Sequence, residues 1–244
     1  MIATNSNVIS IRDPSAELAI DWRYEYNTQS TRWLRQCERR WNRAEQFIRS
    51  GYKIVLLRPL DKATLPLQDS KQVAGLSNPI TNVSTLRKLT HDQSEYHHCN
   101  YGLIYGMECM TVVDLEGPIG GRNTGAEELI TLEVRHSFRV PRNHMVHTPR
   151  GGMHLYCGWT DAIKKKMIKA MDMAMDILTG PASEATGHVV GPLSVTADGE
   201  YIEDINAPIP SVALLQETTL PPEFIALLNG HQESKHPSKG RRGN

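Results

Sequence analysis

Several features that define well-known protein classes are missing from this sequence of 244 residues. It has four cysteines and no C-x-x-C pair, so we expect reduced thiols in a cytosolic protein. No stretch approaches the roughly eighteen consecutive apolar residues of a membrane span, and the first residues are too polar for a signal peptide. No internal repeat is visible. We therefore expect a cytoplasmic protein without a membrane partner.

The chain also has no excess charge of either sign. Lysine and arginine number 27, aspartate and glutamate number 27, and the formal net charge is zero. This excludes a histone-like coat of basic charge but leaves a local basic groove possible. Hydrophobic residues at 39% and charged residues at 22% are ordinary for a globular protein. A chain of this length can bury a real core, as one large domain or two small lobes.

One stretch combines a strand pattern with two acids. The β-branched residues of the run Thr111, Val112 and Val113 favour a strand, in which Asp114 and Glu116 point to the same face. Neighbouring carboxylates repel each other and are costly to bury unpaired, and a hard cation such as Mg²⁺ or Mn²⁺ relieves both costs. Taken alone, the stretch is also compatible with two solvated acids at the end of a strand.

Hydrophobic spacing predicts a helix from Ser30 or Thr31 to about Ser50. Its buried stripe consists of Trp33, Cys37, Trp41, Ala44 and Ile48. A second stripe, on another face, consists of Arg32, Arg35, Arg39 and Arg43. The arginines form either a solvated face or a contact with nucleic-acid phosphates.

The remaining elements follow from alternation and turn residues. Strands are expected near 53–57, 100–106, 111–116, 146–148, 153–157, 173–178, 187–192 and 200–202, the last after a hairpin turn at 197–199, and helices near 83–89, 124–136 and 223–228. Residues 102–116 are expected to form one hairpin, and 161–172, which include Lys165, a basic helix or linker. The cluster His91, His97, His98 and Cys99 lacks the spacing of a zinc finger, which favours a surface loop.

A second candidate site element is the turn Pro149-Arg150-Gly151-Gly152 between two of these strands. The glycines allow backbone to approach a ligand closely, and Arg150 offers a planar charged fork suited to phosphate. His154 shares a strand face with Tyr156 and could equally be a structural histidine. Further on, Asp176 lies between apolar residues and needs a partner, for which a metal is one option.

Together these elements resemble the primase-polymerase (Prim-Pol) domains of the archaeo-eukaryotic primase superfamily, as found in plasmid and phage replication proteins. The resemblance covers roughly residues 45–210. The matching motifs are Y-G-L-I-Y-G at 101–106, V-V-D-L-E-G at 112–117, H-T-P-R-G-G-M-H-L-Y at 147–156, G-H-V-V-G-P-L-S at 187–194 and G-E-Y at 199–201. The opening segment 51–60 with Lys62 is also similar.

The resemblance implies an α/β fold of two lobes, an N-terminal α/β lobe and an RRM-like lobe, with the active site in the cleft between them. It implies that Asp114, Glu116 and Asp176 hold two Mg²⁺ or Mn²⁺ ions for nucleotidyl transfer. The nucleotide phosphates are expected to contact Lys62, Arg150, Gly151, Gly152 and His154. The candidates for binding a single-stranded template are Arg35, Arg39, Arg43 and Lys165.

This interpretation divides the chain into an N-terminal arm at 1–30, a catalytic domain at 31–229 and a disordered basic tail or linker at 230–244. The predicted activity is a DNA primase/polymerase that uses a single-stranded DNA template and (deoxy)nucleoside triphosphates. No G-x-x-x-x-G-K-[ST] motif is present, so unwinding requires a helicase domain or protein.

Two alternatives use the same residues. A metal-dependent phosphodiesterase or nuclease would need the same acids, and a non-catalytic nucleic-acid-binding module of a replication initiator would need none of them. A rolling-circle nicking enzyme is disfavoured because neither His144 and His147 nor His147 and His154 flank a single apolar residue. A non-haem iron oxygenase is disfavoured because it requires H-x-D where this chain has D-x-E.

Overall fold

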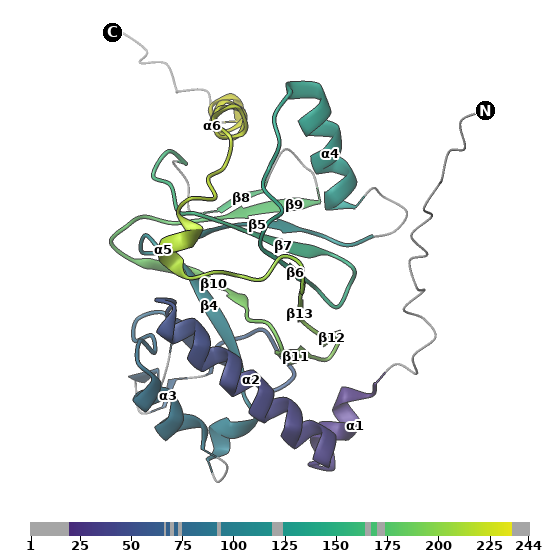
Figure 1. Ribbon diagram of the computed structural model, residues 1–244, viewed down its shortest axis with the longest axis vertical. Helices are drawn as coiled ribbons and strands as arrows, with labels where there is room; N and C mark the ends of the chain where they lie inside the picture. Colours follow the sequence, from purple (N-terminus) through teal and green to yellow (C-terminus); the bar gives the residue numbers. More distant parts are fainter. Residues whose placement is uncertain are drawn as a thin grey trace, which may run out of the picture.

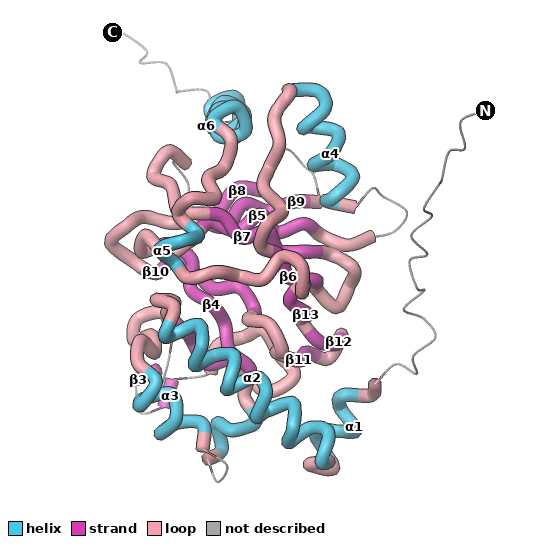
Figure 2. Tube along the Cα trace, viewed as in Figure 1, coloured by secondary structure: helices cyan, strands magenta, loops and turns pink. Residues whose placement is uncertain are grey.

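The structure is a computed structural model. It describes residues 20–65, 67–68, 71–72, 75–91, 94–118, 124–163, 167–169 and 174–235. The longer helices lie at two opposite ends, and the strands lie between them together with one short helix (Figure 2). Lys165, a predicted template contact, is outside the described residues.

The first lobe is built on a sheet of three antiparallel strands in the order β1-β4-β10 (Figure 1). These strands are β1 (Ile54–Leu57), β4 (Asn100–Gly106) and β10 (Ala185–Val190). The lobe's helices are α1 (Trp22–Asn27), α2 (Thr31–Arg49), α3 (Val83–Thr90) and the 3₁₀ helix η2 (Glu95–His98), and a small hairpin joins β2 (Leu67–Gln68) to β3 (Lys71–Gln72).

The long helix α2 forms as the sequence predicts. The Ser30 hydroxyl accepts a hydrogen bond from the Trp33 amide and caps the first turn, where amides have no helical partner. Trp22 and Tyr26 pack on Trp33, so this part of the N-terminal arm lies against α2. One buried residue was not expected: Arg40, with no exposed surface, donates to the Cys99 carbonyl and the Asn100 amide oxygen.

The second lobe is a six-stranded sheet with the order β13-β6-β7-β5-β9-β8, and every neighbouring pair in it is antiparallel. Its strands are β5 (Thr111–Leu115), β6 (Met145–His147), β7 (Met153–Cys157), β8 (Met167–Lys169), β9 (Met175–Leu178) and β13 (Ile202–Glu203). Helices α4 (Gly125–His136) and α6 (Pro222–Lys235) lie beyond this sheet, on the side away from α2 (Figure 1). A short hairpin of β11 (Val195–Thr196) and β12 (Gly199–Glu200) and the one-turn helix α5 (Val212–Leu215) complete the elements.

The strand order explains the likeness of this lobe to an RRM. Four strands lie side by side as β6-β7-β5-β9, and α4 connects β5 to β6, which is a split β-α-β arrangement. The α/β fold and its RRM-like lobe are therefore as expected. The central strand of this lobe is β5, which carries Asp114.

The two lobes share hydrophobic contacts. Alternation along β5 sends Val112 into a core formed with the first lobe, while Val113 and Leu115 pack against α4 and α6. On β7, Tyr156 likewise joins the shared core while Leu155 and Cys157 face the helices. One face of the six-stranded sheet is thus buried against the first lobe, which fixes the position of the site between them.

Four local expectations need correction. Residues 102–116 do not form a hairpin, because β4 and β5 belong to different sheets and share only a bridge between Gly106 and Met110. The basic segment 161–172 is not a helix where it is described, since β8 pairs with β9. The His–Cys cluster is not a surface loop, because His97 and Cys99 are buried around η2. Helix α6 continues to Lys235, past the expected end at Leu228.

All four cysteines are buried and free. Within the described part of the chain, no helix combines the length and the apolar composition needed to cross a bilayer.

Helix α6 is expected to be an integral part of the second lobe. Phe224 has no exposed surface, and its ring centroid lies 5.1 Å from that of Phe138. Phe224→Ala should lower the free energy of unfolding by about 3–5 kcal/mol, because it leaves a cavity in the core. Urea denaturation measures this, with the exposed neighbour Glu223→Ala as control. Equal stability of the two variants would show that α6 is dispensable.

Candidate active site

Three of the predicted site residues lie in one row across the second sheet. Asp114 on β5 is directly opposite His154 on β7 and, on its other side, Asp176 on β9. Residues in register on neighbouring antiparallel strands project to the same face, so the row follows from the pairing. The His154 Nε2 atom lies 3.5 Å from Asp114 Oδ1.

Glu116 lies just beyond the end of β5, and its backbone holds it in place. Its amide donates to the Ala174 carbonyl at 2.8 Å, and its carbonyl accepts from the Gly125 amide at 2.9 Å. The strand therefore continues far enough past Leu115 for Glu116 to face the same side as Asp114.

The predicted phosphate turn packs directly on this strand end. Gly151 has a φ of 76°, a conformation that favours glycine. A Cβ atom added at Gly117 would collide with the Arg150 carbonyl, and one at Gly152 would collide with the Leu115 carbonyl. Glycine at these two positions is what lets the turn approach the acids.

A cavity of about 130 Å³ opens between these elements, and we call it the acid cavity. Its lining residues are Lys62, Asp114, Glu116, Thr148, Pro149, Arg150, His154, Asp198 and Tyr201. Lys62 comes from the loop after β1 in the first lobe, and the acids come from the second. The cavity thus lies between the lobes. Five of the eight residues predicted to bind metal or nucleotide line it, and Asp176, Gly151 and Gly152 do not.

Charge repulsion and burial dominate the electrostatics of the acids. Burial, and then the neighbouring Asp176 carboxylate, raise the pKa of Asp114 to about 6, and the Lys62 ammonium opposes this shift. Ionising one carboxyl group next to another carboxylate costs free energy, and a bound cation lowers that cost.

His154 is held as a neutral imidazole. Burial, and then the nearby Lys62 ammonium, lower its pKa to about 4, so at neutral pH the ring can hydrogen-bond but carries no charge. Its ring centroid lies 5.7 Å from that of Tyr201. Its Nδ1 atom is buried and has no hydrogen-bond partner among the described residues. A neutral ring can donate a hydrogen bond to a phosphate but cannot neutralise its charge.

Arg150 is exposed and pairs with Asp198 of the β11–β12 hairpin. The guanidinium Nη2 lies 2.9 Å from Asp198 Oδ2. This pair raises the pKa of Arg150. A surface pair of this kind contributes little stability, so the guanidinium can exchange its partner for a phosphate at small cost.

The donor set fits a hard divalent cation, since it consists of carboxylate oxygens. Asp114 is the acid that lies near both of the others. It interacts electrostatically with Asp176 across the strand pair, and it lines the cavity together with Glu116. As the side chains stand, no three His, Cys, Asp or Glu residues in the described ranges converge closely enough to hold one ion.

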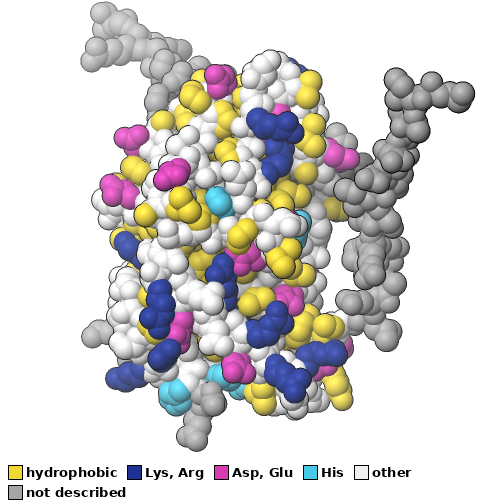
Figure 3. All heavy atoms as spheres, viewed as in Figure 1, with side chains coloured by type: hydrophobic (Ala, Val, Ile, Leu, Met, Phe, Trp, Pro, Cys, Tyr) yellow, Lys and Arg dark blue, Asp and Glu magenta, His cyan; other side chains and the backbone are white. Residues whose placement is uncertain are grey.

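The predicted template arginines are separated by the structure. Arg43 is half-buried and paired with Glu203, with Nε 2.9 Å from Oε2, and it lies over the Phe47 ring. Arg39 is exposed beside Gln36. Basic side chains gather over α2 on the face shown in Figure 3, but acidic ones lie among them. Arg43 is therefore already engaged in the fold, whereas Arg39 is accessible.

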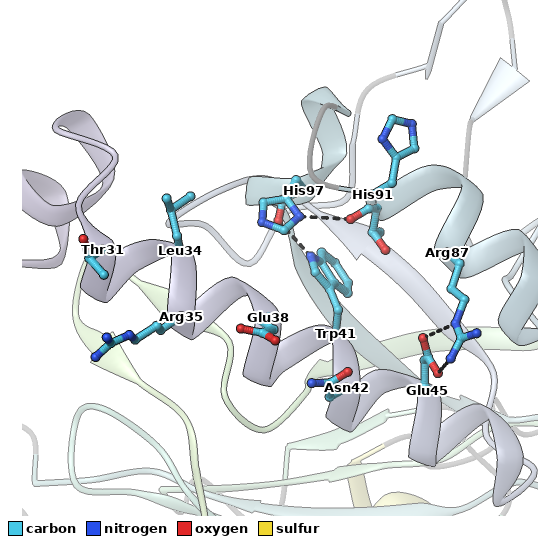
Figure 4. A pocket seen from close by; sticks show the side chains of 11 residues that line it. Thr31, Leu34, Arg35, Glu38, Trp41, Asn42, Glu45, Arg87, His91 and His97 are labelled. Carbon is cyan, nitrogen blue, oxygen red and sulfur yellow. Dashed lines mark hydrogen bonds and ion pairs between the residues drawn. The ribbon is translucent and has the colours of Figure 1, made fainter.

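Arg35 lies in a different and larger cavity, of about 630 Å³, between α2, α3 and η2 (Figure 4). Its walls carry two acids, Glu38 and Glu45, and Arg87 is paired with Glu45 through two hydrogen bonds. None of the predicted catalytic acids lines it. Arg35 is thus not brought to the acid cavity.

Apart from Thr148 and Pro149, which adjoin Arg150 in the turn, two lining residues were not proposed as site residues from the sequence: Asp198 and Tyr201. Asp198 was expected only as part of a hairpin turn, which the β11–β12 pairing confirms. Tyr201 belongs to a motif that supported the resemblance, but nothing in its local pattern showed that its ring would face His154. Both reach the cavity through contacts distant in sequence.

The fold is mixed α/β, and the row of acids lies beside a glycine-containing turn that carries an arginine. Comparison with known families is more specific. The family described as bifunctional DNA primase/polymerase, N-terminal, matches residues 44–221, and the chain belongs to this Prim-Pol family. No curated protein matches the chain.

The close approach of the turn to β5 is expected to be indispensable. Gly117→Ala should destabilise the fold by about 1–3 kcal/mol, because the new methyl group collides with backbone that cannot move freely. Gly230→Ala is the matched control, since nothing lies within 4 Å of a Cβ at that position. Thermal unfolding of both variants tests this. If Gly117→Ala is as stable as the control, the turn does not pack as described.

Proposed function

We propose that the chain is a template-dependent nucleotidyltransferase, a DNA primase/polymerase that makes or extends primers on single-stranded DNA. The observation that carries the proposal is the register of Asp114 with His154 and Asp176, at the wall of a cavity that also holds Lys62 and Arg150. Carboxylates that can bind a metal cation and basic side chains that can bind a phosphate therefore line the same cavity. Membership of the Prim-Pol family supports the same activity.

Each group has a role that its surroundings support. Asp114, Glu116 and Asp176 would hold two Mg²⁺ or Mn²⁺ ions. Such ions, when bound, activate a 3′-hydroxyl and stabilise the pyrophosphate leaving group. Arg150 offers two parallel donors to a phosphate group, and Lys62 offers a point charge. His154 supplies a hydrogen bond from a neutral ring.

The turn contributes orientation. Gly117 and Gly152 allow the turn to pack closely on the strand end, and Arg150 of this turn lines the cavity. Holding the triphosphate beside the acids lowers the entropic cost of aligning the reacting groups. For the template, the exposed Arg39 is the accessible member of the predicted set, and Arg35, Arg43 and Lys165 are weaker candidates.

Removing the charge of Asp114 should abolish synthesis without harming the fold. In Asp114→Asn, incorporation of nucleotides on a primed single-stranded template should fall at least about 100-fold, because a direct ligand matters at least as much as residues that support ligands. The unfolding temperature should be unchanged or higher, since an ionised Asp114 is costly beside Asp176. Glu223→Gln, an exposed acid on α6, is the control. Full activity of Asp114→Asn would refute the proposed role.

The main competing activity is that of a nuclease that uses the same acids. One incubation distinguishes it from the proposed polymerase. Labelled single-stranded DNA with Mg²⁺ or Mn²⁺ but without nucleotides should remain intact, whereas adding ATP or dATP with an oligothymidine template should give longer products. Shortening of the DNA in the absence of nucleotides, lost in Asp114→Asn, would instead identify a phosphodiesterase. Binding of DNA without either reaction, unaffected by Asp114→Asn, would identify a non-catalytic binding module.

A further inference from the structure

The two ends of the loop that carries Lys62 are joined by backbone contacts. It leaves β1 at Arg58 and returns at Thr64, which bridges to Leu57. Within it the Arg58 amide donates to the Ala63 carbonyl at 2.9 Å. Leu60 takes a φ of 55°, in the left-handed region that non-glycine residues rarely adopt, so the loop needs support from outside.

Part of that support comes from Asn100, which has no exposed surface. Its Nδ2 atom lies 3.3 Å from the Asp61 carbonyl and 2.6 Å from the Val195 carbonyl, and its Oδ1 atom accepts from the Val195 amide. The same side chain therefore joins the loop to β11, the start of the hairpin that carries Asp198. The Ala197 amide adds a bond to the Leu60 carbonyl at 3.0 Å.

The contact closest to Lys62 is made by His188 on β10. The His188 Nε2 atom lies 3.0 Å from the Lys62 carbonyl. The ring lies against Gly102 of β4, where a Cβ atom would come within 2.7 Å of His188 Cδ2. Burial lowers the pKa of His188, so the ring is neutral at pH 7, and because a carbonyl can only accept, the proton must be on Nε2.

The orientation of this loop decides where the Lys62 ammonium lies. That ammonium is 5.8 Å from the centre of the Tyr201 ring and acts electrostatically on both Asp114 and His154. The Lys62 residue is exposed, and its side chain hydrogen-bonds to Tyr201. The carbonyl anchor constrains the backbone end of the same residue and so sets the point from which the side chain reaches Tyr201 and the acids.

We propose that His188 is a positioning residue for nucleotide binding, which holds the Lys62 carbonyl so that the Lys62 ammonium faces the triphosphate in the acid cavity. Asn100 supports the same loop from the neighbouring carbonyl. This inference rests on the proposed function, because it assigns the nucleotide as the ligand of Lys62. His188 itself does not line the acid cavity and so acts only through Lys62.

Two substitutions at one position separate the hydrogen bond from the packing. His188→Phe keeps a planar ring over Gly102 but removes Nε2, and it should raise the KM for the nucleotide about threefold to tenfold, the range of one lost hydrogen bond. The kcat should stay within about twofold. His188→Gln returns an amide nitrogen near the position of Nε2 and should restore most of the KM. If His188 had only a structural role, the KM would not rise at a nearly constant kcat, and His188→Gln would not restore the KM.

A double-mutant cycle tests the route through Lys62. Lys62→Ala should raise the KM at least as much as His188→Phe, and adding His188→Phe to Lys62→Ala should produce no further rise. Rises that multiply would show that His188 acts independently and would overturn the proposal. So would an unchanged KM in His188→Phe, or a fall in kcat alone.

The assay is extension of a primed oligothymidine template with ATP and dATP in turn, with thermal unfolding of each variant measured in parallel. Glu133→Gln, on α4 and outside the acid cavity, is the control: it weakens the partly buried ion pair with Arg142 and should leave the KM unchanged. If His188→Phe does not fold, His188→Ala takes its place in the same cycle under the same criteria. No synthesis by the unmodified chain would refute the proposed function, whereas normal synthesis with an unchanged KM in the variants would refute only the role of His188.

Discussion

The partly buried position of Asp114 beside Asp176 is the constraint on which the rest of the site depends. Two carboxylates on adjacent strands repel each other, and burial adds to the cost of ionising Asp114. Such an arrangement persists only if the surrounding structure is stable enough to impose it. Here the imposed part is the register of β7, β5 and β9, in which a slip of one residue would turn every acid to the opposite face.

The register is secured by packing on both faces of the sheet. Tyr156 and Val112 are buried against the first lobe, while Leu155 and Val113 are buried against α4 and α6. Neither strand can therefore slip without exposing apolar surface on one side and burying polar groups on the other. The two hydrophobic cores stabilise the fold and so offset the repulsion between the acids. The site lies where the two lobes meet.

The sequence was sufficient to predict the elements that depend only on a local residue pattern. The β-branched run before Asp114, the two glycines after Arg150 and the cap at Ser30 each carry their own structural signal, and the structure contains the corresponding strand, turn and helix. The hairpin expected between β4 and β5 failed because turn residues show that the chain reverses, not which sheet each strand joins. Asp198, Tyr201 and His188 could not be assigned roles, since their positions depend on pairing between segments far apart in the chain.

The distribution of positive charge limits how the site can bind a nucleotide. His154 is neutral and Arg150 is shared with Asp198, so Lys62 is the cation in the acid cavity that acts on both Asp114 and His154. Lys62 also belongs to the first lobe, whereas the acids belong to the second. Under the proposed function, nucleotide affinity then depends on how firmly the loop after β1 is held against β10 and β11, and so on hydrogen bonds outside the cavity. This is the physical reason for proposing a positioning role for a histidine that does not line the cavity.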